Sequence, residues 1–228
     1  AASIDHPFLQ ERELHKRLIL VVSSDKGLCG SYNSNILRAA EDWMNAHDDA
    51  ENELFIVGRK AREYFRRRRW TIVEAIIDMG GMIDLPRIQG VADELMRRYL
   101  ADEYQEVVVV YTRFLSTLSY RPSEFRLLPF STEEAAGDQD GSTKDYIYEP
   151  DAETVLQLLL PKSVRVKVFN ALADSFTSEH GARMTSMGSA TDNAGELIDQ
   201  LTLFRNRARQ AAITSELVEI VTGAQALD

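Results

Sequence analysis

Residues 17–35, "RLILVVSSDKGLCGSYNSN", place a short apolar run directly before a loop that contains two glycines. The run at 17–23 is rich in β-branched residues, bounded by polar ones, and short enough for a strand buried on both faces. A helical spacing of apolar residues begins at 33, just after the loop. A strand, a glycine-containing loop and a helix in this order open many α/β folds, some of which hold phosphate at that loop.

The alternation of strand-like and helix-like segments continues to about residue 130. The strand-like segments are short and mostly rich in valine, isoleucine or leucine, and most are followed by apolar residues at helical spacing. This order predicts an α/β fold in which a mainly parallel, Rossmann-like sheet has helices on both faces. The predicted strands cover 17–23, 53–58, 70–76, 106–112 and 124–130, and the predicted helices cover 33–47, 59–68 and 85–104.

The glycine loop does not match the known phosphate-binding patterns. A Walker loop needs its lysine directly before a serine or threonine at the helix start, whereas Lys26 precedes Gly27. A dinucleotide fingerprint needs three glycines in the order G-x-G-x-x-G, whereas Gly27 and Gly30 supply only G-x-x-G. We therefore expect a structural loop in which the glycines permit a tight turn and Asn33 or Ser34 caps the following helix.

The composition disfavours several functional classes. The formal net charge is −10, from 36 acidic and 26 basic side chains, and phosphate binding on nucleic acid needs clustered Lys and Arg. The four arginines at 66–69 are expected to form a solvated helix end, and salt bridges to an acidic partner subunit stay open. The four histidines are scattered without ligand spacing, so no metal site is predicted.

Cys29 is the only cysteine, so neither an internal disulfide nor a cysteine metal cluster can form. We expect it to be a small packed side chain, in a reducing compartment such as a cytosol. The longest apolar runs are far shorter than the roughly 18 residues that a membrane span requires.

The last third of the chain lacks strand-like segments. Residues 151–160 predict a short helix, which Pro161 is expected to end or kink. From 162 to 222 there is no proline, and alternate steps of three and four residues trace the heptad seam of a coiled coil. One helix from 166 to 218 would be about 80 Å long. The seam consists of Val166, Phe169, Ala173, Phe176, His180, Arg183, Met187, Ala190, Ala194, Leu197, Leu201, Phe204, Ala208, Ala211, Ser215 and Val218, of which His180, Arg183 and Ser215 are not apolar.

A seam of this length needs another helix beside it, because helices in proteins gain most of their stability from packing an apolar face. The rest of the chain offers none of equal length, so the partner is either a second chain or a helix upstream of Ala1. Gly181, Gly188 and Gly195 recur at seven-residue spacing in the same segment, and each costs roughly 1 kcal/mol relative to alanine. They are either tolerated surface glycines or a narrow face that another helix or a protein wall approaches closely.

Two separated stretches resemble one known family. They are "SSDKGLCGSYNSN" (23–35) and "ARMTSMGSATDNAGELIDQLTLFRNRARQAAITSELVEIVTGAQAL" (182–227), and both are similar to the gamma subunit of the F-type rotary ATP synthase. The stretches "HPFLQERE" (6–13) and "YIYEPD" (146–151) agree with that family in position and order. The resemblance therefore covers almost the whole chain.

The resemblance implies a non-catalytic central-stalk rotor subunit that couples proton-driven rotation to ATP synthesis. In that family the N- and C-terminal helices form an antiparallel coiled coil inside the hexamer of alpha and beta subunits. The α/β domain lies against the epsilon subunit and the membrane ring of c subunits, peripherally, at the cytoplasmic face of the inner or plasma membrane. The family's N-terminal helix is not in this sequence, and no cofactor or bound nucleotide is expected. The expected parts are a linker at 1–16, an α/β domain at 17–150 and half of the rotor shaft at 151–228.

The resemblance also implies which residues contact the alpha/beta hexamer. Family members use polar residues near the end of the C-terminal helix to contact loops of the beta subunits. Arg183 lies on the seam itself, where an unpaired charge is costly, so it must reach solvent or meet a carboxylate. The predicted partner-contact residues are Arg183, Arg209, Gln210, Thr214, Glu216 and Glu219.

A different class of function stays open from the residues alone. A small-ligand-binding α/β domain with a dimerising coiled-coil tail would pair its seam with a second copy and bind an anion at 24–34. A catalytic centre is not expected in either case, because no nucleophile with an adjacent base can be identified.

Overall fold

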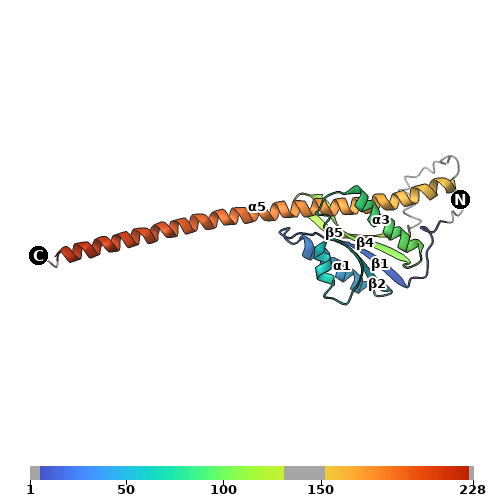
Figure 1. Ribbon diagram of the computed structural model, residues 1–228, viewed down its shortest axis with the longest axis horizontal. Coiled ribbons are helices and arrows are strands. Elements are labelled where there is room, and N and C mark those ends of the chain that lie inside the picture. Colours follow the sequence, from blue (N-terminus) through green and yellow to red (C-terminus); the bar gives the residue numbers. More distant parts are fainter. Residues whose placement is uncertain (1–5, 131–151, 226–228) are drawn as a thin grey trace, which may run out of the picture. The chain divides into compact units, whose positions relative to one another are not determined.

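The computed structural model describes residues 6–130 and 152–225 (Figure 1). Strands and helices alternate as far as β4, the last strand follows it directly, and one long helix completes the described chain. The elements are β1 Lys16–Val22, α1 Tyr32–Ala46, β2 Glu51–Val57, α2 Arg59–Phe65, β3 Thr71–Ile76, α3 Leu85–Leu100, β4 Glu106–Ser116, β5 Ser119–Leu128 and α5 Ala152–Gln225.

The strands form one five-stranded sheet in the order β3-β2-β1-β4-β5. β1 pairs in parallel with β2 and β4, β2 pairs in parallel with β3, and β5 runs antiparallel to β4. In the central strand Leu20 lies opposite Phe55 of β2 and Val109 of β4. The predicted mainly parallel α/β sheet is confirmed, with one antiparallel strand at its edge.

Both faces of the sheet are covered. Successive side chains of a strand point to opposite sides, so the residues of β1 divide between two cores. Leu18, Leu20 and Val22 of β1 belong to a core that includes buried residues of α3 and α5. Ile19 and Val21 of the same strand belong to a second core with α1 and α2. The run that opens the fold is apolar throughout because neither of its faces meets water.

β4 continues beyond its predicted end at 112 and turns back at once as β5. Ser116 pairs with Ser119, so Thr117 and Leu118 form a two-residue turn. Such turns usually carry Gly, Asn or Asp. Neither residue is one of these, which is why the sequence indicated a separate, later strand instead of a hairpin.

Helix α5 runs through Pro161 without a break, so the prediction of a separate short helix before this proline is wrong. An interior proline costs about 3 kcal/mol, because it removes one helical hydrogen bond and its ring crowds the preceding turn. Packing offsets this cost. Leu160, Val164 and Val168 recur at four-residue spacing and are buried in the core that covers one face of the sheet.

The described part of the predicted linker is anchored to the α/β domain by Phe8. Its ring is buried, and its centroid lies 6.0 Å from that of Tyr99 in α3. Its carbonyl oxygen accepts a hydrogen bond from the backbone N–H of Phe130 (2.8 Å). The residues before β1 thus contribute to the core instead of only connecting to it.

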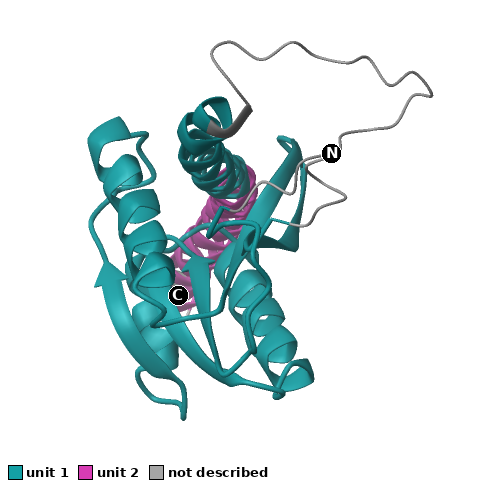
Figure 2. Ribbon diagram, turned by 90° about the vertical axis from the view of Figure 1, so that its right-hand side faces the viewer, with its two compact units in different colours: residues 1–184 teal, residues 185–228 magenta. Residues whose placement is uncertain are grey.

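The chain divides into two compact units, residues 1–184 and 185–228 (Figure 2). The first contains the sheet, α1 to α3 and the first part of α5, and the described part of the second is the remainder of α5. The sequence placed the boundary at 150, whereas the structure divides the chain within the last helix. None of the described helices combines the length and the apolar character needed to cross a bilayer.

Candidate functional site

The loop between β1 and α1 is held by the side chain of Asp25. Its carboxylate accepts backbone N–H groups from Arg59 (3.0 Å), Asp78 (3.0 Å) and Gly80 (2.8 Å). These donors belong to the start of α2 and to the segment after β3, so one carboxylate joins three parts of the carboxyl edge of the sheet. A phosphate group would have to compete with a negative charge that is already bound, which supports the structural interpretation of the loop.

The turn itself differs in one detail from the prediction. Gly30 has a φ of 55°, as a tight turn needs, but the other positive φ, 61°, falls on Leu28 and not on Gly27. Cys29 is buried beside Tyr32, which confirms the prediction of a small packed side chain.

Helix α1 begins without the predicted side-chain cap. Its N-cap residue is Ser31, and no side-chain oxygen accepts a hydrogen bond from the first turn. Asn33 is turned toward the loop, where its Oδ1 accepts from the backbone N–H of Ser24 (3.1 Å). Ser34 Oγ donates to the Ser31 carbonyl oxygen (3.0 Å). The prediction of Asn33 or Ser34 as the cap is wrong because both side chains have these other partners.

Helix α5 fills the crevice between the carboxyl ends of β1 and β4. An open α/β sheet ordinarily binds ligands there, because the strand connections diverge at this point. Ser175 Oγ accepts from the backbone N–H of Thr112 (3.1 Å), and Ser178 Oγ donates to the carbonyl oxygen of Thr112 (3.4 Å). The chain's own helix therefore occupies the ligand position, which argues against the small-ligand alternative.

Arg183 is the one predicted contact residue that lies in the first unit. Its guanidinium donates to the carboxylate of Glu179 (2.6 Å) and to the carbonyl oxygen of Gly27 (3.3 Å). The side chain of Glu179 is only 3% exposed. Of the two predicted outcomes for Arg183, solvent or a carboxylate, the structure has the carboxylate. Glu179 lies one turn away in α5 itself, so only the bond to Gly27 links α5 to the glycine loop. The contact of Arg183 with a partner subunit stays a prediction.

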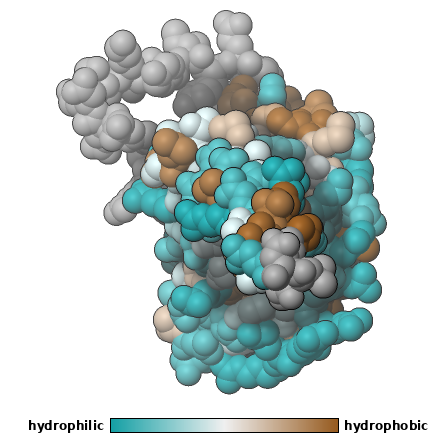
Figure 3. Space-filling view, turned by 90° about the vertical axis from the view of Figure 1, so that its left-hand side faces the viewer, coloured by the Kyte–Doolittle hydropathy of each residue, from teal (hydrophilic) through white to brown (hydrophobic). Residues whose placement is uncertain are grey.

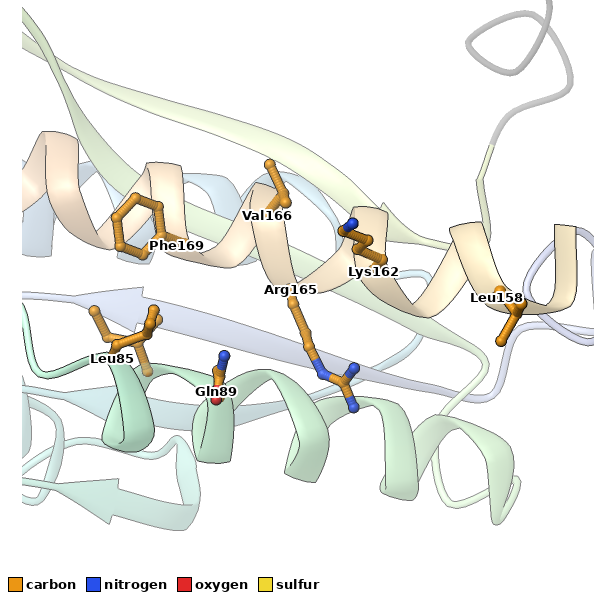
Figure 4. Close-up of a pocket in the computed structure, with 8 residues that line it drawn as sticks. Leu85, Gln89, Leu158, Lys162, Arg165, Val166 and Phe169 are labelled. Atoms are coloured by element: carbon orange, nitrogen blue, oxygen red, sulfur yellow. The ribbon is translucent and has the colours of Figure 1, made fainter. Parts of the chain in front are cut away.

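An apolar groove of about 620 Å³ lies between α3 and α5 (Figure 4). Arg165 reaches from α5 across to Asp93 of α3 (2.7 Å). Leu158 is 72% exposed, so the groove is open to solvent. Val166 and Phe169 are also the first two seam positions. The sequence did not reveal it, because it depends on where α3 lies. Its lining residues are Leu85, Ile88, Gln89, Leu158, Lys162, Arg165, Val166 and Phe169.

The second unit exposes the seam along its described length. Every apolar seam residue from Met187 to Val218 is exposed, and the largest of them, Phe204, is 71% exposed. Figure 3 shows apolar side chains gathered in patches on an otherwise largely hydrophilic face. Exposed apolar surface of this extent marks an interaction site. In the first unit, by contrast, the seam residue Phe176 is buried in the chain's own core, so part of the predicted seam is covered within the chain, and an outside partner for the remainder stays a prediction.

A second apolar row lies near the end of α5. Ile213, Leu217 and Ile220 follow one another at four and three residues, and each is at least half exposed. A helix has 3.6 residues per turn, so this row faces away from the seam residues Ala211 and Val218. One partner helix cannot cover both rows. The second row follows the same spacing of three and four residues as the predicted seam, so it can be recognised in the sequence.

The five predicted contact residues of the second unit are all exposed, but they form two groups and not one cluster. Gln210 and Thr214 share a face, and the Thr214 hydroxyl donates to the Gln210 carbonyl oxygen (2.8 Å). Arg209 and Glu216 are seven residues apart and share another face, and Glu219 lies one turn beyond Glu216. Their roles in partner binding stay predictions.

The three glycines of α5 have different surroundings. A Cβ atom at Gly181 would lie 3.1 Å from the carbonyl oxygen of Thr117, so a close approach within the chain favours glycine there. At Gly188 and Gly195 a Cβ atom would meet no described atom within 4 Å. Only an outside partner could give these two glycines a packing role.

We expect Gly195→Ala to stabilise α5 in the full-length chain by about 1 kcal/mol, because alanine loses less backbone entropy in a helix. Circular dichroism during thermal unfolding measures this change. Ser189→Ala, also exposed on the helix, is the matched control. If a partner lies against the glycine face, Gly195→Ala also lowers recovery of the assembled complex. Destabilisation of the isolated chain would contradict the exposed position of this residue.

The arginines at 66–69 follow α2, which ends at Phe65, and do not lie within it as predicted. All four are exposed, and Arg68 pairs with Glu41 (3.0 Å). This confirms a solvated helix end. Among the described residues no ion pair is found for the other three arginines, and no group of His, Cys, Asp or Glu is placed to hold a metal ion.

Comparison with known sequences gives consistent matches over almost the whole chain. A family model described as ATP synthase matches residues 1–227. The chain is 45% identical over 221 residues to the ATP synthase gamma chain of Moorella thermoacetica, covering 97% of this chain and 77% of that protein. It is 44% identical over 224 residues to the ATP synthase gamma chain of Desulforamulus reducens, covering 98% of this chain and 77% of that one.

Comparison with solved structures supports the fold. A chain of the Tetrahymena thermophila mitochondrial ATP synthase, from a structure of the central stalk and c-ring, matches with a TM-score of 0.62 and 24% identity, over 80% of this chain and 79% of that one. A chain of the Euglena gracilis mitochondrial ATP synthase rotor matches with a TM-score of 0.65 and 19% identity, over 88% and 75%.

Proposed function

The chain belongs to the ATP synthase gamma chain family, and we propose that it is the rotor shaft that carries ion-driven rotation to the catalytic hexamer. It would contribute no catalytic group of its own. The observation that carries the proposal is the described end of α5, which exposes apolar rows on more than one face. A helix of this kind is stable only when other protein encloses it.

The first neighbour of α5 is a second helix of the same full-length protein. The chain covers 77% of the Moorella thermoacetica relative, so that relative has further residues beyond the match. An antiparallel helix placed on the seam of the second unit would bury Leu197, Leu201 and Phe204. Pairing of this kind makes the shaft stiff, because each helix then packs as in a coiled coil.

The second neighbour is the ring of alpha and beta subunits. The row of Ile213, Leu217 and Ile220 faces away from the seam, so an enclosing apolar wall is the neighbour that fits it. Polar residues beside this row, Arg209 and Gln210 among them, would engage loops of the beta subunits in turn. A shaft whose faces differ would then hold the three catalytic sites in different states as it rotates.

The α/β domain is the foot of the shaft in this proposal. It would contact the epsilon subunit and the ring of c subunits, peripherally, at the cytoplasmic face of the membrane. Two features support a structural role for this domain at the base of the shaft. Asp25 ties three loops together, and Ser175 and Ser178 fix α5 in the ligand crevice next to them.

We expect Arg209→Ala combined with Gln210→Ala to lower ATP turnover of the assembled complex at least tenfold while assembly persists. The two side chains are exposed, so their loss costs the isolated chain little, whereas a central polar contact at an interface is worth about 2 kcal/mol or more. Turnover of the purified complex and subunit stoichiometry by native mass spectrometry measure the two effects.

Glu196→Ala is the control, because Glu196 is exposed on α5 and precedes Arg209 by more than three helical turns. Normal turnover of the double variant would remove these residues from the coupling role. A full-length protein that forms a nucleotide-binding homodimer and never recovers alpha and beta subunits would overturn the rotor proposal itself.

A further inference from the structure

Residues 59–69 carry a concentrated positive charge in an otherwise acidic chain. They hold seven of the 26 basic side chains and one acidic side chain, Glu63, so the formal charge of the segment is +6. Because the whole chain carries −10, all other residues together carry −16. A local charge of the opposite sign to its surroundings attracts anionic partners and selects among them.

The fold places this segment on the face of the sheet opposite α5. Ala61 and Phe65 of α2 are buried with α1 in one core, whereas α5 belongs to the core on the other face. Arg59, Arg62 and the four arginines at 66–69 are all exposed. A partner bound to this segment would therefore leave α5 uncovered.

A hollow of about 470 Å³ lies between α1 and α2 at this segment. Four of its eight lining residues are basic and one is acidic. The lining residues are Asn33, Leu37, Lys60, Glu63, Tyr64, Arg66, Arg67 and Arg68. The positive charge therefore converges on one concave site.

Part of this lining is held by contacts within the chain. The Arg68 guanidinium donates to the carboxylate of Glu41 (3.0 Å) and lies over the Tyr64 ring, 3.3 Å from its centroid. Lys60 donates to the carboxylate of Glu63 (3.2 Å). These contacts form the wall of the hollow and neutralise two of its four basic groups.

Arg66 and Arg67 are the two remaining basic groups of the hollow. Both are exposed, and within residues 6–130 and 152–225 neither side chain has a hydrogen bond or an ion pair. A guanidinium group is a planar set of N–H donors that can bind a carboxylate or a phosphate group through two parallel hydrogen bonds. The hollow can therefore bind two anionic groups of one ligand.

The surroundings of the hollow favour a narrow ligand over a broad polyanion. Arg68 contacts Glu41 of α1, and the exposed residues Asp42 and Asp48 follow on that helix and in the loop after it. A DNA duplex or an anionic membrane surface would extend beyond the hollow to these carboxylates, which repel it over about 8 Å at physiological salt. A peptide segment with several carboxylates is narrow enough to enter the hollow alone.

We propose that this hollow docks a short acidic segment of another protein, and that Arg66 and Arg67 bind its carboxylates. Leu37 and Tyr64 supply apolar surface for the rest of the segment. The proposal goes beyond the rotor function and does not rest on it, because the docking face lies on the opposite side of the sheet from α5.

Fluorescence anisotropy of a fluorescein-labelled oligoglutamate peptide, titrated with the full-length protein, tests the proposal. We expect Arg66→Gln combined with Arg67→Gln to weaken binding about tenfold or more, because hydrogen bonds between charged groups contribute more than neutral ones. Both arginines are exposed, so we expect the Tm of the double variant to be unchanged.

Arg113→Gln combined with Arg121→Gln is the matched control. These two arginines are also exposed and are paired in register across β4 and β5, so this variant loses the same charge at another place. Equal weakening by the two double variants, or no binding of the peptide at physiological salt, would overturn the proposal. So would a DNA duplex or a phosphatidylserine vesicle that binds more tightly than the peptide and depends equally on Arg66 and Arg67.

Discussion

Phe204→Asp in the full-length protein is expected to prevent recovery of the assembled complex. Phe204 is 71% exposed in the described chain, and in the proposed shaft it is buried between two helices. A carboxylate left without a partner in that interface costs roughly 3–5 kcal/mol. Each 1.4 kcal/mol is a factor of ten, so helix pairing weakens at least a hundredfold. Affinity purification through an alpha or beta subunit measures the result.

Asn206→Asp is the matched control for this substitution. It introduces the same charge two residues away, which is about 200° further around the helix, and therefore on the opposite face. This face continues into the row of Ile213, so the control is measured through helix pairing: we expect Asn206→Asp to leave the thermal unfolding curve unchanged. Normal assembly of Phe204→Asp, with an unchanged thermal unfolding curve, would show that nothing packs against the seam at this position.

Leu172→Ala is expected to lower the free energy of unfolding of the first unit by about 2–5 kcal/mol, because it leaves a cavity where the side chain was packed. Leu172 is fully buried in the core between the sheet and α5. The loss is a large part of the 5–15 kcal/mol that typically stabilises a domain. Urea unfolding of the full-length protein, followed by fluorescence, measures it as a lower midpoint.

The same substitution at an exposed leucine shows how much of the loss comes from packing. Leu118, in the turn between β4 and β5, is 77% exposed. We expect Leu118→Ala to change the free energy of unfolding by no more than about 0.5 kcal/mol. Equal losses for the two variants would mean that α5 does not contribute to the core as the structure indicates.

The sheet and its layers could be predicted from the sequence because burial on both faces leaves a clear pattern. Runs such as 18–22 and 107–110 are apolar at every position, which only a strand covered on both sides requires. The seam of α5 could be predicted for a similar reason, since its period of three and four residues persists over many turns. Both features depend on local patterns repeated often enough to outweigh exceptions.

The features that could not be predicted depend on single side chains or on contacts between distant segments. The hairpin at 117–118 lacks the usual turn residues, and Pro161 is tolerated only because its neighbours in α5 are buried. Asn33 does not cap α1, because its side chain accepts a hydrogen bond from the backbone N–H of Ser24 in the loop. The groove beside α3 exists only once α5 has packed against the sheet.

The role of Asp25 has a consequence for how the domain behaves in a cell. In an open α/β sheet that binds a phosphate ligand at its carboxyl edge, the bound anion can dissociate. Here the anion that holds the edge is the carboxylate of Asp25, which is part of the polypeptide and cannot dissociate. The stability of this edge therefore does not depend on the concentration of nucleotides around the protein. A part that transmits force continuously needs this independence.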